Sequence, residues 1–570
     1  MKYKLLEKSL NDAENVIQTI LINRGIDNWQ EYLNLNDSHC NPYEYLDNIN
    51  EAVELFDKHF SQRNPMAILI DEDVDGFCSA ACMYNYIKCL DDTYPVYYIL
   101  HNHNKAHGLA KMKNGDFEIP EDVKLFIIPD AGTNDVEQMN ELAGRSIDCI
   151  CCDHHQCEVD YVKCNAIIVN NQISEKYTDK DFCGTGIVYE FLRALDDWYV
   201  CDLANNFLDL VCFANIADVM SMKDFQTRYY VNQGFDNVTN KFLLAIMKAQ
   251  DFSTKGVWNI FNVAWYLVPP INSLVRIGSI EDKDLLFRAF IETDEVFPYK
   301  KRGSTEFVDE DIYTRAARLC KNTKSKQDKM RDKLCEELKE QVDYNDKVAI
   351  LVADDADSGI VGLSCSKLAD AVGRPCIVVR DIGDGTLSGS ARNCRNSVVQ
   401  DFKELINSTE IFNFAQGHSG AFGCSLNVDK LQLARETLNK VLENYHYDDT
   451  IYCDFVLESD DIDSWFVKTI DDSKWLYGTG IEEPTVAVEN VTITAEDCSI
   501  MGQNLDAVAF MYNGIKYCKF KCLEDDELLD FASRDDDSEI TLNVIGKCSI
   551  NTYGNSTTAQ FIIDDYEITI

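Results

Sequence analysis

Five short apolar runs alternate with amphipathic segments between residues 63 and 220, and this alternation is the feature that most constrains the fold. The runs have the length and the polar boundaries of buried strands, and they occupy residues 67–70, 96–100, 123–129, 146–152 and 166–170. Segments with helical spacing lie over residues 77–90, 186–195 and 207–220. Strands that alternate with helices predict an α/β fold with a parallel, doubly wound sheet. Functional sites in such sheets form beyond the carboxyl ends of the strands.

Ionisable side chains gather where these apolar runs end. Asp71, Asp130 and Asp153 stand at three strand ends, and Asp218 ends an apolar helix. The candidate metal ligands at this edge are carboxylates and one imidazole: Asp71, Asp73, Asp75, Asp130, His154 and Asp218. Such a mixture favours Mn²⁺, Mg²⁺ or Fe²⁺ over a zinc–thiolate site. Several converging carboxylates predict two ions about 3.5–4 Å apart, the arrangement used for phosphoester hydrolysis.

His155 follows a predicted ligand and is a candidate catalytic group, because an imidazole there could contact the scissile phosphate or protonate the leaving group. Asp153 and Asp73 complete the candidate catalytic residues.

Each of these motifs, when taken alone, also fits another interpretation. The acidic turn could be solvated or bind Ca²⁺, but it lacks the EF-hand spacing and the closing Glu. The cysteines and histidines of residues 151–157 could form a zinc site, but their spacing is too tight for a usual structural one. The two histidines could also be an ordinary polar pair at a strand end. Ionisable groups at four successive element ends together favour the metal centre.

Net charge argues against nucleic acid as a ligand unless cations are locally concentrated. The chain carries 97 Asp and Glu against 53 Lys and Arg, a net charge of −44. Proteins that neutralise phosphates usually present a basic surface. Residues 315–333 reverse the sign, with eight Lys and Arg against two Asp. We interpret this stretch either as a solvated connector helix or as one wall of a groove for an anionic ligand.

Composition also predicts where the protein works. No apolar run reaches the roughly 18 residues of a membrane span, so we expect no membrane association. Residues 1–11 contain no apolar signal segment. The 23 cysteines are an odd number without framework spacing, so we expect reduced thiols. These features predict a cytoplasmic, intracellular protein.

A second α/β unit is predicted from apolar runs at residues 348–352 and 376–379, with a helix over 361–372 between them. Glycine-rich turns are expected at residues 383–389 and 416–423, and a long polar helix over 304–344. After residue 447, short strands with Asn, Gly and Asp turns predict a small OB-like barrel. The expected divisions are a helical N-terminal segment packed on the first α/β domain (residues 1–62), that domain (63–300), the connecting helix (301–346), the second α/β domain (347–447) and the barrel (448–570).

Further polar residues are candidates for binding a substrate. His101 and His103 follow a predicted strand, and His107 precedes Gly108-Leu109. All three are expected to line the same cleft, although ordinary loop histidines fit equally well. His418 stands among small residues whose backbone N–H groups can approach an anion. Ser390 and Arg392 could supply further donors and a cation.

In chain order, Asp73-Val74-Asp75-Gly76, Asp130, Asp153-His154-His155 and Asp218 resemble the four motifs of the DHH phosphoesterase superfamily. The chain is more specifically similar to the RecJ-like single-stranded-DNA exonucleases. Nearly the whole length takes part, because the similar segments are residues 24–26, 208–211, 217–219, 269–276, 359–362, 374–375, 389–392, 417–418 and 543–546.

The resemblance implies a DHH domain, a long connecting helix, a DHH-associated domain and an OB-like barrel. It implies a 5′-to-3′ exonuclease in DNA repair or recombination that uses Mn²⁺ or Mg²⁺ and releases mononucleotides from single-stranded DNA. A single-strand-binding protein or a helicase is the protein partner that it suggests. The substrate-binding residues that follow from the resemblance and from the motifs above are His103, His107, Asn272, Arg276, Ser390, Arg392, Gly417 and His418.

The chain departs from the family at positions outside the metal motifs. Gln416 and Val275 each replace a usual Gly, Asp357-Ser358 replaces His-Pro, and His103 stands where an Arg is expected. Two other functions compete with the exonuclease. A DHH phosphodiesterase for short oligonucleotides or cyclic dinucleotides would usually lack residues 447–570. A non-catalytic replication scaffold would have no need of the complete metal motifs.

Overall fold

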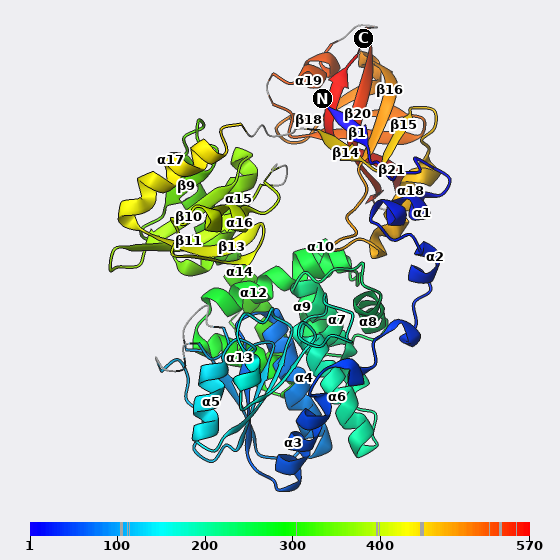
Figure 1. The fold of residues 1–570 in the computed structure, drawn as a ribbon. Coiled ribbons are helices and arrows are strands. Elements are labelled where there is room, and N and C mark those ends of the chain that lie inside the picture. Colours follow the sequence, from blue (N-terminus) through cyan, green and yellow to red (C-terminus); the bar gives the residue numbers. More distant parts are fainter. Residues whose placement is uncertain are drawn as a thin grey trace.

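The computed structural model describes residues 1–102, 107–110, 112, 115–301, 303, 305–394, 397, 399–444, 450–523, 525–534, 538–553 and 556–569. Figure 1 shows three bodies: an α/β body at the bottom, a smaller α/β body at the left and a β-rich body at the top right. Both ends of the chain lie on the β-rich body. Among the described residues, no helix combines the length and the hydropathy that crossing a membrane requires.

The first α/β body is built on the parallel sheet that the apolar runs predict. Its strand order is β3-β2-β4-β5-β6, and every neighbouring pair is parallel. The α/β fold class is therefore confirmed, and the bounds match the prediction within two residues at nearly every end. The strands are β2 (Met66–Ile70), β3 (Val96–Leu100), β4 (Leu125–Pro129), β5 (Asp148–Asp153) and β6 (Ile167–Asn170).

Alternate side chains of the buried strands enter two different cores, which is why these runs are apolar throughout. Met66, Ile68 and Ile70 join the cluster that includes residues of α3 (Ile49–Ser61), α4 (Val74–Leu90) and α6 (Gly184–Tyr199). Ala67 and Leu69 join the opposite cluster with α5 (Val136–Gly144). Helices thus cover both faces, and the carboxyl edge of the sheet remains for polar residues.

The N-terminal segment does not pack as one unit on this body. β1 (Tyr3–Leu5) pairs in parallel with β14 (Ile451–Cys453) of the β-rich body. Arg24 Nη1 lies 2.6 Å from Asp454 Oδ1 and extends the same attachment. Only the later part, ending in α3, packs on the first sheet. Helical periodicity predicts an apolar face, but it does not say which surface that face covers, so this expectation was wrong for the first 24 residues.

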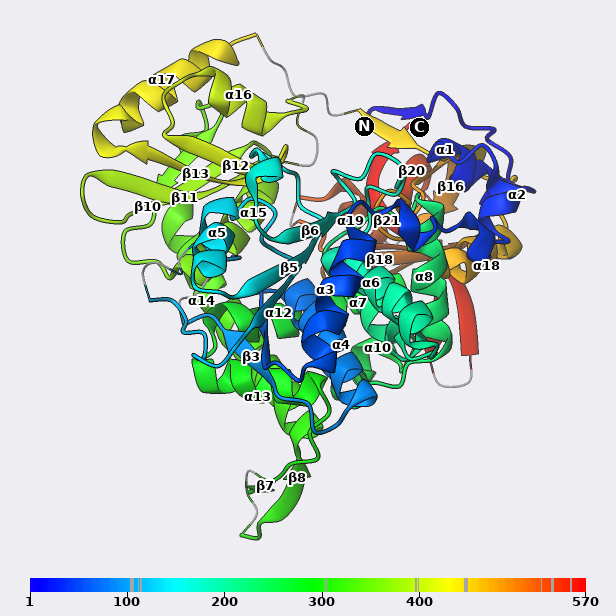
Figure 2. The same ribbon diagram turned by 60° about the horizontal axis from the view of Figure 1, so that its bottom comes forward.

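The long helix is α14 (Ile312–Lys339), and it begins eight residues later than predicted. A hairpin of β7 (Val296–Tyr299) and β8 (Val308–Asp311) precedes it and projects from the body in Figure 2. Arg315 lies 4.6 Å from the ring centre of Phe297, and Arg318 lies 4.3 Å from that of Tyr299. Two of the eight cations of the basic stretch therefore brace this hairpin instead of lining a groove.

The smaller α/β body has the strand order β12-β13-β11-β10-β9, with only β9 and β10 parallel. The two glycine-rich segments contain turns at residues 384–385 and 419–420, as predicted, but the rest of each is mostly strand, and Gly389 lies within β11. A Cβ on Gly389 would lie 1.9 Å from the Val378 carbonyl oxygen, so glycine here permits close strand approach. The elements are β9 (Ala349–Val352), α15 (Ser358–Val372), β10 (Cys376–Asp381), β11 (Thr386–Arg392), β12 (Phe414–His418) and β13 (Ala421–Asn427).

The β-rich body contains a seven-stranded sheet with the order β15-β16-β20-β21-β19-β18-β17. Most of its neighbouring pairs are antiparallel, which is compatible with an OB-like barrel. The strands are β15 (Phe455–Glu458), β16 (Val486–Thr494), β17 (Cys498–Met501), β18 (Ala507–Tyr512), β19 (Ile515–Phe520), β20 (Glu539–Tyr553) and β21 (Ser556–Ile568).

Candidate metal centre

The acidic turn after β2 begins helix α4. Asp73 is the N-cap, and its side chain accepts a hydrogen bond of 2.9 Å from the Gly76 N–H. Asp75 consequently lies in the first turn of the helix. A Cβ on Gly76 would come within 2.6 Å of the Asp71 Cβ and main-chain oxygen, so only glycine lets the turn fold this tightly. The local sequence therefore brings three carboxylates to one strand end.

Asp75 is oriented by the N-terminus of a second helix. The backbone N–H groups of Gly184 and Thr185, at the start of α6, donate to its two carboxylate oxygens, each at 2.8 Å. A helix N-terminus interacts favourably with negative charge, and these two hydrogen bonds fix the direction of the carboxylate. Its Oδ2 lies 3.9 Å from His154 Nε2.

Asp130 follows β4 and is the most exceptional group at this edge. It adopts φ +60, a backbone conformation that few non-glycine residues take without a compensating role. Its Oδ1 is buried and has no hydrogen-bond partner among the residues that the structure describes. Burial, reinforced by Asp75 and Asp73, raises the pKa of Asp130 well above its usual range. A buried, unpartnered carboxylate oxygen among other carboxylates has the properties of a cation ligand.

His154 joins these carboxylates across the sheet edge. Its Nε2 lies 3.4 Å from Asp130 Oδ1 and 3.4 Å from Asp218 Oδ2, with Asp218 at the end of α7 (Leu208–Ala217). Burial and the neighbouring His155 lower the pKa of His154 to about 4. The ring is therefore neutral at physiological pH, and its nitrogen lone pair is available to a metal.

In the described part of the chain, three sets of ligand atoms could each hold an ion, because the atoms of each set lie within 4.8 Å of one another. The sets share Asp130 or His154, so they adjoin one another as two neighbouring ions would require. All six candidate ligands fall in at least one set: Asp130, His154 and His155; Asp75, His154 and Asp218; Asp71, Asp73 and Asp130.

His155 Nδ1 lies 2.7 Å from Asp153 Oδ1, so Nε2 is the ring nitrogen that does not make this contact. Asp153 also accepts the backbone N–H groups of Thr133 at 2.9 Å and His154 at 2.7 Å. Burial alone would lower the pKa of His155, but the bond to Asp153 outweighs it and raises the pKa to about 9. Asp153 thus acts on His155, which it orients and keeps protonated.

Asp71 is held by a loop that follows β3. His107 Nδ1 lies 2.8 Å from Asp71 Oδ2, and the Gly108 N–H donates to Oδ1 at 2.9 Å. Burial would raise the pKa of Asp71, but His107 and these hydrogen bonds lower it. The ring centres of His107 and His155 are 4.7 Å apart, so His107 lies at the rim of the centre. His103 lies outside the described residues.

His101 lies at this edge, as the sequence predicts, but its partner Asp116 and the start of α6 were not predicted. His101 is fully buried, its Nδ1 contacts Asp116, and its Nε2 lies 4.0 Å from Asp71 Oδ1. The contact between His101 and Asp116 spans a loop, and no local sequence pattern predicts it. Gly184 and Thr185 were detectable in principle, because small residues that open a helix after a strand are typical of anion-binding N-termini.

The candidate phosphate-binding cations come from two bodies and lie close together. Arg276 ends α12 (Val268–Ile277), and burial lowers its pKa, an effect that nearby Asp73 opposes and nearby Arg392 reinforces. A Cβ on Gly362 of α15 would lie 2.9 Å from Arg392 Nη2 and 3.3 Å from Ser390 Oγ. Arg276, Arg392 and Ser390 therefore gather between α12 and α15.

The remaining candidates flank this group. His418 pairs with Ala421, and Ala421 pairs with Arg392, so the three residues share one end and one face of the sheet. His418 is exposed, and Gly417 beside it has φ +130, which favours glycine. Asn272 lies one helical turn before Arg276, and its buried Oδ1 has no partner within the described part of the chain.

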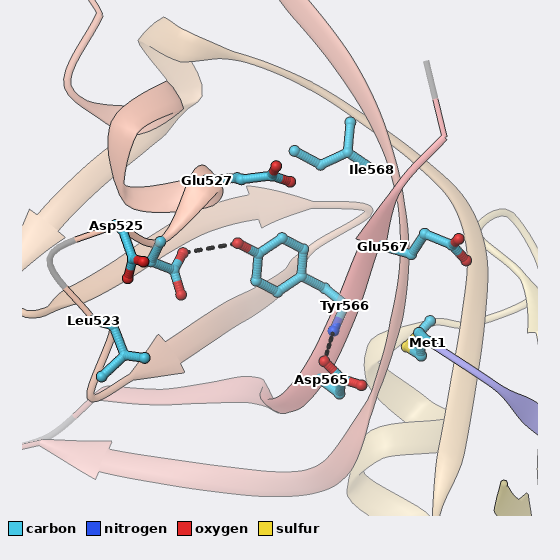
Figure 3. Close-up of a pocket in the computed structure, with 9 residues that line it drawn as sticks. Met1, Leu523, Asp525, Glu527, Asp565, Tyr566, Glu567 and Ile568 are labelled. Atoms are coloured by element: carbon cyan, nitrogen blue, oxygen red, sulfur yellow. Dashed lines mark hydrogen bonds between the residues drawn. The ribbon is translucent and has the colours of Figure 1, made fainter. Parts of the chain in front are cut away.

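A pocket on the β-rich body is a different environment (Figure 3). Five carboxylates line it together with Tyr566, whose hydroxyl donates to Asp526 at 2.8 Å. These carboxylates would repel phosphate, so this face of the body is not a nucleic-acid surface. The acidic residues are Asp525, Asp526, Glu527, Asp565 and Glu567.

Replacing Gly184 with Ala should disrupt the centre without replacing any of the candidate ligands. The added Cβ would lie 2.3 Å from Asp130 Oδ1 and 2.7 Å from its Cα, so Asp130 must move. We expect Mn²⁺ affinity to fall by about 10- to 100-fold, as when groups that support metal ligands are removed. Calorimetric titration with Mn²⁺ measures this effect.

Gly144→Ala is the matched control, because a Cβ there meets no atom within 4 Å. It should bind Mn²⁺ like the parent protein and unfold at the same or a slightly higher temperature. Unchanged Mn²⁺ affinity in Gly184→Ala would contradict the placement of Asp130.

Comparisons with known proteins agree with this geometry. The family model "DHH family, N-terminal domain" matches residues 65–214. A prophage-derived protein of Bacillus subtilis named as a single-strand DNA-specific exonuclease, YorK, is 32% identical over 100% of this chain and 98% of its own length. The RecJ exonuclease of the same organism is 25% identical, over 98% of this chain and 69% of that protein.

A solved structure shares the fold over the full length. The crystal structure of Thermus thermophilus RecJ in complex with Mn²⁺ aligns with a TM-score of 0.73 at 17% identity, covering 100% of this chain and 78% of that one. With the ordered DHH motifs on one sheet edge and a full-length relative at 32% identity, the chain belongs to the RecJ-like family of the DHH superfamily.

Proposed function

We propose that this protein is a metal-dependent exonuclease that hydrolyses single-stranded DNA to mononucleotides. The observation that carries the proposal is the position of Arg276, Arg392 and Ser390 beside the carboxylate edge. The first body supplies the metal ligands and Arg276, and the second supplies Arg392 and Ser390. That arrangement suits one phosphodiester held across two bodies. The names of the prophage and RecJ relatives support DNA as the substrate.

The residues present fit divalent cations. The donors are carboxylate oxygens and an imidazole nitrogen, the set that Mn²⁺ and Mg²⁺ accept, and Asp130 Oδ1 is buried without a partner among the described residues. We assign the ions to Asp73, Asp75, Asp130, His154 and Asp218, with Asp71 as a further ligand or as a support for Asp73. When bound, two such ions would activate water and stabilise charge on the phosphate oxygens.

The chain's own residues bind and orient the substrate. Arg276 and Arg392 would pair with phosphate oxygens, and Ser390, Gly417 and His418 would donate further hydrogen bonds. His155 carries a proton on Nδ1 toward Asp153, and its raised pKa of about 9 keeps Nε2 protonated as well at neutral pH. It can therefore donate to a phosphate oxygen or to the departing oxygen.

Finer features of the function remain part of the proposal. We propose digestion from the 5′ end, a role in DNA repair or recombination, a cytoplasmic site of action, and a single-strand-binding protein or helicase as partner. We also propose the five divisions predicted from the sequence, with the first 24 residues reassigned to the barrel. The high negative charge supports a need for a partner that delivers DNA.

Digestion of an oligonucleotide labelled separately at each end tests the proposal. Purified protein with Mn²⁺ should release labelled mononucleotides at once from the 5′-labelled strand and only late from the 3′-labelled one. EDTA should stop both. Duplex DNA and single-stranded RNA of the same sequence define the substrate range.

Other outcomes identify other functions. Hydrolysis of dinucleotides or cyclic dinucleotides without cleavage of long strands would make the protein a small-substrate phosphodiesterase. Failure to cleave either substrate while Mn²⁺ still binds would favour a scaffold. Early release of the 3′ label would reverse the proposed polarity.

A further inference from the structure

One helical rod connects the phosphate-binding group with a cluster of exposed aromatic rings. It consists of α11 (Ile260–Asn262), a π-helical turn (Val263–Leu267) and α12, which follow one another without a break. Arg276 and Asn272 stand near its C-terminal end. Phe261 and Trp265 stand near its N-terminal end, with ring centres 6.2 Å apart. π-helical turns are rare and occur often at functional sites.

The two ends present their side chains on the same side. Trp265 precedes Arg276 by eleven residues, which is close to three α-helical turns, and the wider π turn shifts the angle by only about 50°. Phe261 and Asn272 have the same spacing, but the whole π turn lies between them, so their angle shifts by about 90°. At about 1.5 Å per residue, Trp265 lies roughly 16 Å from Arg276 along the rod.

The aromatic end is exposed to an unusual degree. Trp265 is 63% exposed, Phe261 49% and Phe252, on the neighbouring α10 (Asp251–Thr254), 89%. Gln250 Nε2 donates a hydrogen bond of 3.0 Å to the main-chain carbonyl oxygen of Tyr266, which connects α10 to the π turn. Three exposed large rings on adjoining elements mark a surface for another molecule. Figure 1 places α10 on the side of the first α/β body that faces the β-rich body.

Cations accompany these rings although the chain is strongly acidic. Lys255 Nζ lies 4.7 Å from the ring centre of Phe252. Lys321 of α14 lies beside the start of α10, where its ammonium group donates to the main-chain carbonyl of Ala249. Exposed rings with nearby ammonium groups form the surface on which single-stranded nucleic acids stack their bases and place their phosphates.

We propose that Phe261, Trp265 and Phe252 form a base-stacking platform for the part of the DNA strand that has not yet reached the metal centre. The inference rests on the proposed function, because the rod leads from the platform to the phosphate-binding arginine. Bases spaced 3.4 Å apart would need about five nucleotides to span roughly 16 Å. Strands of two or three nucleotides would therefore miss the platform, and strands of ten or more would reach it.

The test compares strand lengths in a Phe261→Ala, Trp265→Ala double variant. Binding of fluorescent (dT)20 in EDTA, where no hydrolysis occurs, should weaken by about 10- to 100-fold, because stacking on an aromatic ring contributes substantially to the binding free energy of each base. Hydrolysis of a trinucleotide with Mn²⁺ should keep its rate and KM within about twofold. The KM for (dT)20 should rise, while kcat remains near that of the parent.

Trp198→Ala is the matched control. Trp198 is 50% exposed on α6, at the end opposite to Gly184 and so about 21 Å along that helix from the metal centre. It should bind (dT)20 like the parent. A fluorescence change on (dT)20 binding should persist in Trp198→Ala and largely disappear in Trp265→Ala.

The results separate the platform from the proposed function. Unchanged (dT)20 affinity in the double variant would overturn the platform, as would equal losses for the trinucleotide and (dT)20; the first result would mark the rings as a surface for a protein. If the parent binds (dT)20 through Trp265 but hydrolyses no strand, the exonuclease proposal fails and the platform stands.

Discussion

Asp130→Asn will abolish hydrolysis while leaving the fold intact. The substitution keeps the size of the side chain but removes one anionic ligand from two of the three ligand sets. We expect activity to fall by more than about 100-fold, beyond the loss seen when only a supporting group is removed. Metal-dependent release of mononucleotides from (dT)20 measures the loss.

For the metal-free protein, we expect Asp130→Asn to have the opposite effect on stability: no loss, or a gain. Burial and the neighbouring carboxylates raise the pKa of Asp130, so its ionised form destabilises the fold, and this cost grows as pH rises through the raised value. Asparagine removes the charge, so in EDTA the variant should unfold at the same or a higher temperature than the parent. Added Mn²⁺ should stabilise the parent far more than the variant.

These two readouts distinguish a ligand from a merely structural residue. If Asp130 only supported the fold, its replacement would lower the unfolding temperature both with and without metal. Full activity in Asp130→Asn would remove the metal assignment altogether.

His155→Asn will lower kcat by about 10²- to 10⁴-fold, the range in which a positioned proton donor contributes. KM should change less, because Arg276 and Arg392 remain to bind phosphate. Single-turnover kinetics with (dT)20 would separate the two effects.

The pH dependence gives a more specific readout. In the metal-free protein the pKa of His155 is raised to about 9 by its bond to Asp153, so the imidazolium stabilises the fold fully below about pH 6.5 and loses this effect as pH rises through 9. Asp153→Asn should lower the pKa of His155, which an NMR titration of the metal-free protein would detect. An unshifted pKa would contradict the orienting role of Asp153.

The parallel sheet and its metal edge were predictable because they follow from local rules. Continuous apolar runs identify β2 to β6, and the carboxyl ends of parallel strands share one edge, so Asp71, Asp130 and Asp153 had to meet. Asp75 and His154 follow β2 and β5 and reach the edge by the same rule, whereas Asp218 is brought there by the packing of α7. Neither result needs knowledge of how the separate bodies pack.

What escaped the sequence depends on contacts between distant segments or on backbone geometry. No local signal shows that β1 completes the β-rich body, or that Arg315 and Arg318 brace a hairpin. Glycines at residues 383–389 suggest turns, yet Gly389 is needed where β10 and β11 approach closely. The exposure of Trp265 was equally hidden, because a helical pattern does not reveal a π turn.

The pairing of β1 with β14 has a consequence for how the chain is made. Tyr3 is synthesised nearly 450 residues before its partner Ile451. At about 5–20 residues per second, the wait lasts roughly 20 to 90 seconds. During that time both α/β bodies can fold, while the first strand stays unpaired beside the ribosome. Completion of the last body is therefore a late step that depends on both ends of the chain.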